Sequence, residues 1–195
     1  MKFLLQSPRR FLLAAILVSM AQCAILASMI VTRAQVLRFG QEVLLRSAPV
    51  DPRDLLRGDY VVLTYDISAI AVERLKGRRP ADNIYAPVYV RLKPAEDGYW
   101  AVDEASFDPI AHQEGSAVLA SDPISVSSWL WSPGNQIRLT YGIERYYVPE
   151  DEGRSIEDAR NDGRVSVAIR VGESGRAQIR ALMLDGKPLY EEPLY

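Results

Sequence analysis

The sequence predicts a mainly β domain preceded by one transmembrane helix. Three observations support this: an uncharged run from Phe11 to Thr32, short alternating segments rich in β-branched and aromatic residues after it, and a close similarity between two of those segments. The 195 residues are enough for one ordinary domain and a helix, but not for two large domains. We expect a single domain of two repeated β units, packed as a sandwich or barrel.

The uncharged run is long enough to cross a bilayer. At 1.5 Å per residue it reaches about 33 Å, close to the roughly 30 Å thickness of the hydrocarbon layer. It is longer than the apolar core of a signal peptide, about 7–15 residues, and therefore predicts a retained anchor. Basic residues occur in the short N-terminal tail, which favours a cytoplasmic N-terminus. We assign residues 1–10 to a cytoplasmic tail, 11–32 to the transmembrane helix and 33–195 to an extracytoplasmic domain.

The domain begins after Gly40, which is expected to stop the helix. Alternation and β-branched content predict strands at residues 42–46, 60–67, 87–93, 99–103, 137–147, 165–171 and 177–185. Residues 51–56 are expected to form a short turn, 68–86 mostly exposed loop, and 155–160 a short helix capped by Ser155 and Asp158. Trp129 and Trp131 alternate and are expected on one strand face, and the proline-containing tail is expected to be coil or an edge strand.

Two segments of the domain are similar and share five of ten residues. GDYVVLTYDI at 58–67 aligns with GNQIRLTYGI at 134–143, so that Tyr65 aligns with Tyr141. Downstream, VYVRL at 88–92 resembles VAIRV at 167–171. The sequence therefore predicts an internal repeat, with units at about 58–103 and 134–185.

Composition argues against several kinds of chemistry. Residues 33–195 carry 20 basic and 25 acidic side chains, which is a poor balance for nucleic-acid binding. The single cysteine, Cys23, lies in the apolar run, and the single histidine is His112, so no disulfide, thiol chemistry or histidine-rich metal site is expected. The acidic run at 150–152 lacks the spacing of a calcium loop. We expect no cofactor, no metal and no enzymatic activity.

One catalytic alternative is a serine–lysine membrane peptidase that uses Ser47. Such chemistry needs a lysine whose pKa is lowered by burial. The domain has only Lys76, Lys93 and Lys187, each beside a glycine or proline or in a turn-like segment. The sequence favours this alternative least.

The segments PVDPRDLLRGDYVVLTYDI and YGIERYYVPEDEG resemble the bacterial GDYXXLXY family, whose pattern stands here as Gly58, Asp59, Tyr60, Leu63 and Tyr65. The resemblance implies a single-pass, membrane-anchored bacterial protein. With the orientation that the basic tail favours, we expect it in the inner membrane with its domain in the periplasm. It also implies a polytopic membrane protein as partner, because members are often encoded beside or fused with one. It carries over no catalytic residue.

The residues around the motif suggest two interpretations. In one, Gly58, Asp59 and Tyr60 only shape a turn and start a strand. In the other, they belong to a docking surface for the membrane partner. The candidate residues are Asp51, Arg53, Asp54, Arg57, Gly58, Asp59 and Tyr60 from the first copy and Glu144, Tyr147 and Glu150 from the second, with Tyr65 and Tyr141 between the halves.

These residues predict a non-enzymatic accessory module anchored in the membrane. The alternative is a β domain that binds a small molecule or lipid in an apolar cavity lined by Tyr65 and Tyr141. A packed interior at these two tyrosines would exclude that cavity.

Overall fold

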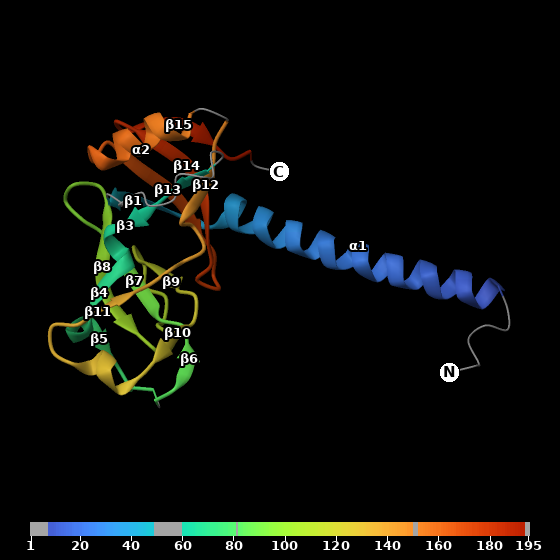
Figure 1. Ribbon diagram of the computed structural model, residues 1–195, viewed down its shortest axis with the longest axis horizontal. Coiled ribbons are helices and arrows are strands. Elements are labelled where there is room, and N and C mark those ends of the chain that lie inside the picture. Colours follow the sequence, from blue (N-terminus) through green and yellow to red (C-terminus); the bar gives the residue numbers. More distant parts are fainter. Residues whose placement is uncertain (1–7, 49–59, 81, 150–151, 194–195) are drawn as a thin grey trace. The chain divides into compact units, whose positions relative to one another are not determined.

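The computed structural model describes residues 8–48, 60–80, 82–149 and 152–193 (Figure 1). The described chain divides between Gln35 and Val36 into two compact units. The first unit is most of the helix α1 (Pro8–Phe39). Among the described residues, Arg9–Phe39 is the one helix long and apolar enough to cross a membrane, with a mean hydropathy of 2.2 in its most apolar window.

The helix ends where the sequence predicts. The Gly40 amide donates to the Val36 carbonyl at 2.9 Å, and the first strand begins at the next residue. A side chain at Gly40 would collide with that carbonyl and lie 3.0 Å from the Val171 carbonyl oxygen. Glycine is therefore required here by the close approach of two backbones.

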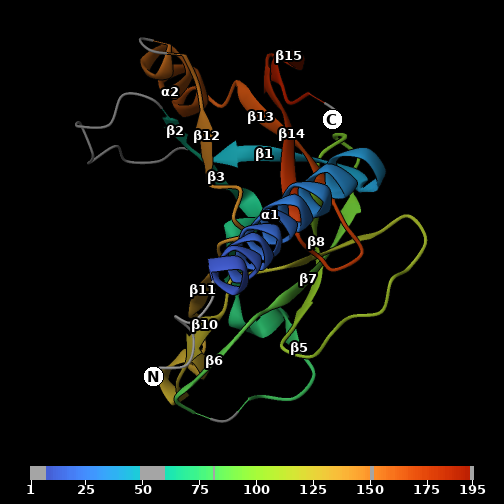
Figure 2. The same ribbon diagram turned by 90° about the vertical axis from the view of Figure 1, so that its right-hand side faces the viewer.

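The domain is mainly β, as predicted, and its strands form two larger sheets (Figures 1 and 2). The five-stranded sheet has the order β15–β14–β13–β1–β3 and comprises β1 (Gln41–Ala48), β3 (Thr64–Tyr65), β13 (Val165–Val171), β14 (Ala177–Leu184) and β15 (Lys187–Glu191). The four-stranded sheet has the order β5–β8–β7–β9 and comprises β5 (Leu75–Lys76), β7 (Tyr89–Pro94), β8 (Trp100–Ser106) and β9 (Ala117–Ala120).

Three two-stranded ribbons complete the domain. They pair β2 (Tyr60–Val62) with β12 (Arg145–Tyr147), β4 (Ala69–Ala71) with β11 (Gln136–Arg138), and β6 (Ile84–Ala86) with β10 (Ile124–Val126). Short helices lie between strands: η1 (Asp66–Ser68), η2 (Val72–Arg74), η3 (Ser128–Trp131) and α2 (Gly153–Asn161). The described strands thus form two larger sheets and three two-stranded ribbons.

Two of the ribbons have matching registers. In β2–β12, Tyr60 lies opposite Tyr147, Val61 opposite Tyr146 and Val62 opposite Arg145. In β4–β11, Gln136 lies opposite Ala71, Ile137 opposite Ile70 and Arg138 opposite Ala69. When Tyr65 is aligned with Tyr141, every pair in the first ribbon corresponds to a pair in the second.

The two sheets also match in their central hairpins. The β13–β14 hairpin has a register shift between Ala168 and Ile169, and the β7–β8 hairpin has one between Arg91 and Leu92. In each sheet a strand from the other half of the chain pairs with the hairpin: β1 with β13, and β9 with β7. When the two bulges are superposed, Leu92 corresponds to Ile169. The alignment predicted from sequence instead matches Leu92 with Val171, two residues further on.

One hydrophobic core joins these elements. It includes Val43 and Leu45 of β1, Val90 and Leu92 of β7, and Ile169 of β13, all at most 1% exposed. The alternation of β1 and the hairpin strands explains this burial, because every second side chain points to the same face. Residues of the ribbons β2–β12 and β4–β11 belong to the same core.

The structure corrects several expected elements. The strand expected at 60–67 is divided into β2, β3 and η1, and the strand expected at 137–147 into β11 and β12. The segment 68–86, expected as mostly loop, contains β4, η2, β5 and β6. The α2 helix begins at Gly153 rather than Ser155, and Ser155 Oγ donates to the Glu152 carbonyl from within the helix. Trp129 and Trp131 lie in the 3₁₀ helix η3, not in a strand.

Candidate functional site

Seven of the predicted site residues lie outside the described residues. They are Asp51, Arg53, Asp54, Arg57, Gly58, Asp59 and Glu150. The described part of the candidate surface therefore begins at Tyr60, the first residue of β2.

The structure brings Tyr60 and Tyr147 together on the outer face of the β2–β12 ribbon. Their ring centroids are 6.0 Å apart and the ring planes meet at 62°, an edge-to-face contact. The Arg145 guanidinium lies over the Tyr60 ring, 5.5 Å from its centroid. Tyr147 is nevertheless 73% exposed. We call Tyr60, Arg145 and Tyr147 the aromatic patch.

A buried arginine connects this ribbon to α2. Arg160 of α2 is fully buried, and its Nη1 donates to the Val62 carbonyl at the end of β2. Burial of a guanidinium is costly unless its donors are used, so this contact fixes the ribbon against the helix. Sequence reasoning missed Arg160, because a single arginine on a short helix gives no sign of burial.

Tyr65 and Tyr141 are core residues that bond across the two halves. The Tyr65 hydroxyl donates to the Ile143 carbonyl at 2.5 Å, and the Tyr141 hydroxyl donates to the Ile67 carbonyl at 2.8 Å. The two bonds are reciprocal under the alignment of Tyr65 with Tyr141. Both rings are at most 5% exposed. The interior is packed at these residues, so they do not line the cavity considered from the sequence.

Glu144 lies beside both tyrosines. Its Oε1 accepts a hydrogen bond of 2.6 Å from the Tyr141 amide, as the Ser68 hydroxyl does from the Tyr65 amide at 3.3 Å. Burial raises the pKa of the Tyr65 and Tyr141 hydroxyls well above the ordinary value, and the negative charge of Glu144 raises it further. Glu144 is therefore part of the junction between the halves rather than of the aromatic patch.

Ser47, the nucleophile of the peptidase alternative, lies near the end of β1. Its side chain is buried, and its Oγ donates to the Thr64 carbonyl at 3.4 Å. Lys76 forms an ion pair with Glu104 at 3.2 Å, and Lys93 forms one with Asp103 at 3.0 Å. This geometry adds no support to the serine–lysine hypothesis.

His112 and the acidic residues that the structure describes form no recognisable metal centre. His112 Nε2 lies 3.3 Å from the Glu173 carbonyl oxygen at an exposed position. In the part of the chain that the structure describes, no group of three or more His, Cys, Asp or Glu residues is placed to hold a metal ion.

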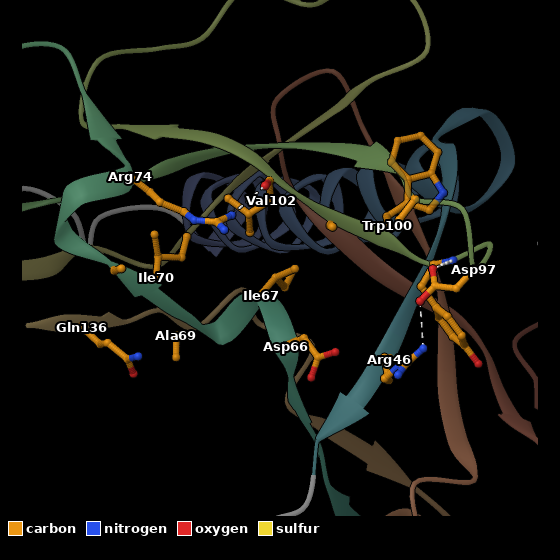
Figure 3. Close-up of a pocket in the computed structure, with 14 residues that line it drawn as sticks. Arg46, Asp66, Ile67, Ala69, Ile70, Arg74, Asp97, Trp100, Val102 and Gln136 are labelled. Atoms are coloured by element: carbon orange, nitrogen blue, oxygen red, sulfur yellow. Dashed lines mark hydrogen bonds and ion pairs between the residues drawn. The ribbon is translucent and has the colours of Figure 1, made fainter. Parts of the chain in front are cut away.

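A second feature was not anticipated from the sequence. A pocket of about 420 Å³ opens beside the β4–β11 ribbon, within the range of roughly 300–1,000 Å³ typical of small-molecule sites (Figure 3). Its larger apolar lining residues include Ile67, Ile70, Trp100 and Val102, and its charged lining residues are Arg46, Asp66, Arg74 and Asp97. We call it the β4 pocket.

The pocket is bounded at one end by an ion pair. Arg46 Nη2 of β1 lies 2.9 Å from Asp97 Oδ2 in the β7–β8 turn, and its guanidinium lies 4.7 Å from the Tyr99 ring centroid. At the corresponding place in the other half, the Ala120 amide donates directly to the Gly175 carbonyl at 2.9 Å. A side-chain contact thus takes the place of a backbone contact at the pocket.

The comparisons with known proteins give one match. The family model described as "GDYXXLXY protein" matches residues 22–182. No curated protein and no solved structure matches the chain.

Proposed function

The chain belongs to the GDYXXLXY family, and we propose that it is a non-enzymatic accessory module, anchored in the bacterial inner membrane, that docks on a polytopic membrane protein. The apolar helix is the basis for the anchor, since it is long enough to span a bilayer. The anchor confines the domain to the surface of the membrane, where the exposed loops of polytopic proteins are its neighbours.

The aromatic patch is the observation that carries this proposal. Tyrosine and arginine are enriched among the residues that dominate protein–protein binding energy, and Tyr147 presents most of its ring to solvent. The Tyr60–Tyr147 contact and the Arg160 bond to β2 hold the patch in one geometry before binding. Preorganisation lowers the entropy cost of association. Tyr60 of the patch directly follows the charged 51–59 segment in the sequence.

Affinity purification of the full-length chain from detergent-solubilised membranes tests this proposal. We expect a polytopic membrane protein to co-purify with the native chain and its yield to fall at least about tenfold with Tyr147→Ala, as for a binding hot spot. Tyr85→Ala is the matched control, because Tyr85 is 77% exposed on a different ribbon. Equal recovery with Tyr147→Ala and Tyr85→Ala, or recovery of no polytopic protein, would contradict docking through the patch.

The proposed topology places the N-terminus in the cytoplasm and the domain in the periplasm. Lys2, Arg9 and Arg10 support this orientation, because basic residues favour the cytoplasmic side. A reporter fused after Tyr195 that is active only outside the cytoplasm should therefore be active. Activity of a cytoplasm-only reporter at the same position would reverse the orientation.

We also propose that the domain arose from two copies of one β unit. The matching registers of the ribbons and the reciprocal tyrosine bonds support this. In this view the copies are intertwined, because the β2–β12 and β4–β11 ribbons each take one strand from each copy.

A further inference from the structure

The β4 pocket and the aromatic patch lie on corresponding strands, β4 and β12. Aligning Tyr65 with Tyr141 places Ala69 and Ala71 of β4 on Arg145 and Tyr147 of β12. Both alanines line the pocket. The small side chains of β4 leave space beside this ribbon, whereas the longer side chains of Arg145 and Tyr147 project from the other ribbon.

The charged groups around this space are balanced but not all paired. Two arginines and two aspartates line the pocket, and Arg46 and Asp97 neutralise each other. Arg74 Nη1 donates to the Val102 carbonyl at 3.1 Å but has no carboxylate partner among the described residues. Asp66 is exposed at the pocket, and its carboxylate accepts no hydrogen bond from any described residue. One guanidinium and one carboxylate therefore remain for a ligand.

Apolar side chains separate these two charges. Figure 3 shows Ile67 and Ile70 between the Arg74 and Asp66 side chains. Trp100 lies at the end of the pocket away from Arg74, on the side of Asp97. Ile67 and Ile70 are 2% exposed and form a fixed floor, and Trp100 is half-buried. A complementary ligand has an apolar body, an anionic group for Arg74 and a cationic group for Asp66.

We propose that the β4 pocket binds a small zwitterionic ligand with an apolar body, of the class of short peptides and amino-acid derivatives. Its carboxylate pairs with Arg74, whose planar guanidinium suits bidentate binding of a carboxylate. Its ammonium group pairs with Asp66. A purely anionic ligand is disfavoured by the two aspartates and a purely cationic ligand by the two arginines, since like charges repel. This inference does not depend on docking through the aromatic patch.

Calorimetry on the full-length chain in lipid nanodiscs tests the proposal with trileucine as the probe. We expect trileucine to bind, and its N-acetylated and C-amidated forms each to bind at least about tenfold more weakly, because each has lost one ionic contact. Asp66→Asn should abolish the discrimination against the N-acetylated form only. Arg74→Gln should abolish the discrimination against the amidated form only.

Matched controls separate these effects from general changes in charge. Glu114→Gln and Arg176→Gln alter exposed residues outside the pocket and should leave all three affinities unchanged. Ala71→Tyr, which copies the residue at the corresponding position of the other ribbon, should remove binding while the thermal unfolding transition is retained. If Ala71→Tyr fails to fold, the Asp66→Asn and Arg74→Gln results decide alone.

Three results would overturn the proposal. Trileucine and its capped forms could bind equally, the single variants could leave the discrimination intact, or trileucine could fail to bind. Binding of maltose, an uncharged ligand, with an affinity that Asp66→Asn and Arg74→Gln leave unchanged would likewise show that the unpaired charges do not select the ligand.

Discussion

The β2–β12 and β4–β11 ribbons share one backbone pairing and differ in what they present. Their inner residues are alike: Val61 and Tyr146 in one and Ile137 and Ile70 in the other are all buried. Their outer residues differ, because β12 carries Arg145 and Tyr147 where β4 carries Ala69 and Ala71. The inner face maintains the fold, and the outer face is free to become a projecting patch in one half and a pocket in the other.

The largest expected effect tests whether the inner faces are equivalent. Leu63 and Leu139 occupy matching positions, at most 2% exposed, and their amides donate to the Glu144 and Ser68 carbonyls. Replacing either by alanine should lower the free energy of unfolding by about 2–5 kcal/mol, through lost burial and the cavity left behind. Denaturant titration of the full chain in detergent would measure both. A large loss of unfolding free energy at one site and a negligible loss at the other would show that the two positions are not equivalent.

The hairpin turns should differ from each other. Gly98 and Gly175 both have positive φ, but a side chain at Gly98 meets nothing within 4 Å, whereas one at Gly175 would lie 2.9 Å from the Ala120 nitrogen. Gly175→Ala should cost about 2–4 kcal/mol, because strain and overpacking add, and Gly98→Ala about 1–2 kcal/mol for the backbone strain alone. Thermal unfolding compares the two. Equal shifts in the transition temperature would show that the contact with β9 is not a tight one.

The tyrosine bonds between the halves should contribute equally. Tyr65→Phe and Tyr141→Phe each leave a buried carbonyl, of Ile143 or Ile67, without its donor. We expect each to lower the free energy of unfolding by about 1–3 kcal/mol at neutral pH. Denaturant titration measures the loss. An unchanged free energy of unfolding for either variant would show that its hydrogen bond does not help to join the halves.

The same tyrosines predict a dependence on alkaline pH. Their pKa is raised in the folded state, first by burial and then by Glu144, above the value of about 10 for an unfolded tyrosine. The unfolded chain therefore loses these protons first, and stability that is fully present below pH 10 is lost as the pH rises above it. A variant with both Tyr65→Phe and Tyr141→Phe should show a shallower alkaline decline in the unfolding free energy. An unchanged slope would assign the decline to other groups.

The sequence predicts the parts of this fold that depend on local patterns. Gly40 ends the helix, and the two hairpins appear where alternation and turn residues place them. These features follow from periodicity, which the sequence displays directly.

Other features depend on which strands meet. The 60–67 segment alternates throughout, yet it pairs first with β12 and then with β1, and alternation cannot show that change of partner. The β4 pocket brings together residues as distant in sequence as Arg46, Trp100 and Gln136 and depends on the small size of two alanines. No local signal marks an alanine that leaves a cavity.

We infer that the two ribbons have the same backbone register and serve two different binding roles. The most direct measurement is a crossed one, in which partner recovery and trileucine affinity are both determined for Tyr147→Ala and Ala71→Tyr. We expect Tyr147→Ala to lose recovery of the polytopic partner and to retain trileucine binding. We expect Ala71→Tyr to lose trileucine binding and to retain recovery of the partner. Loss of both functions in both variants, or of neither, would contradict this inference.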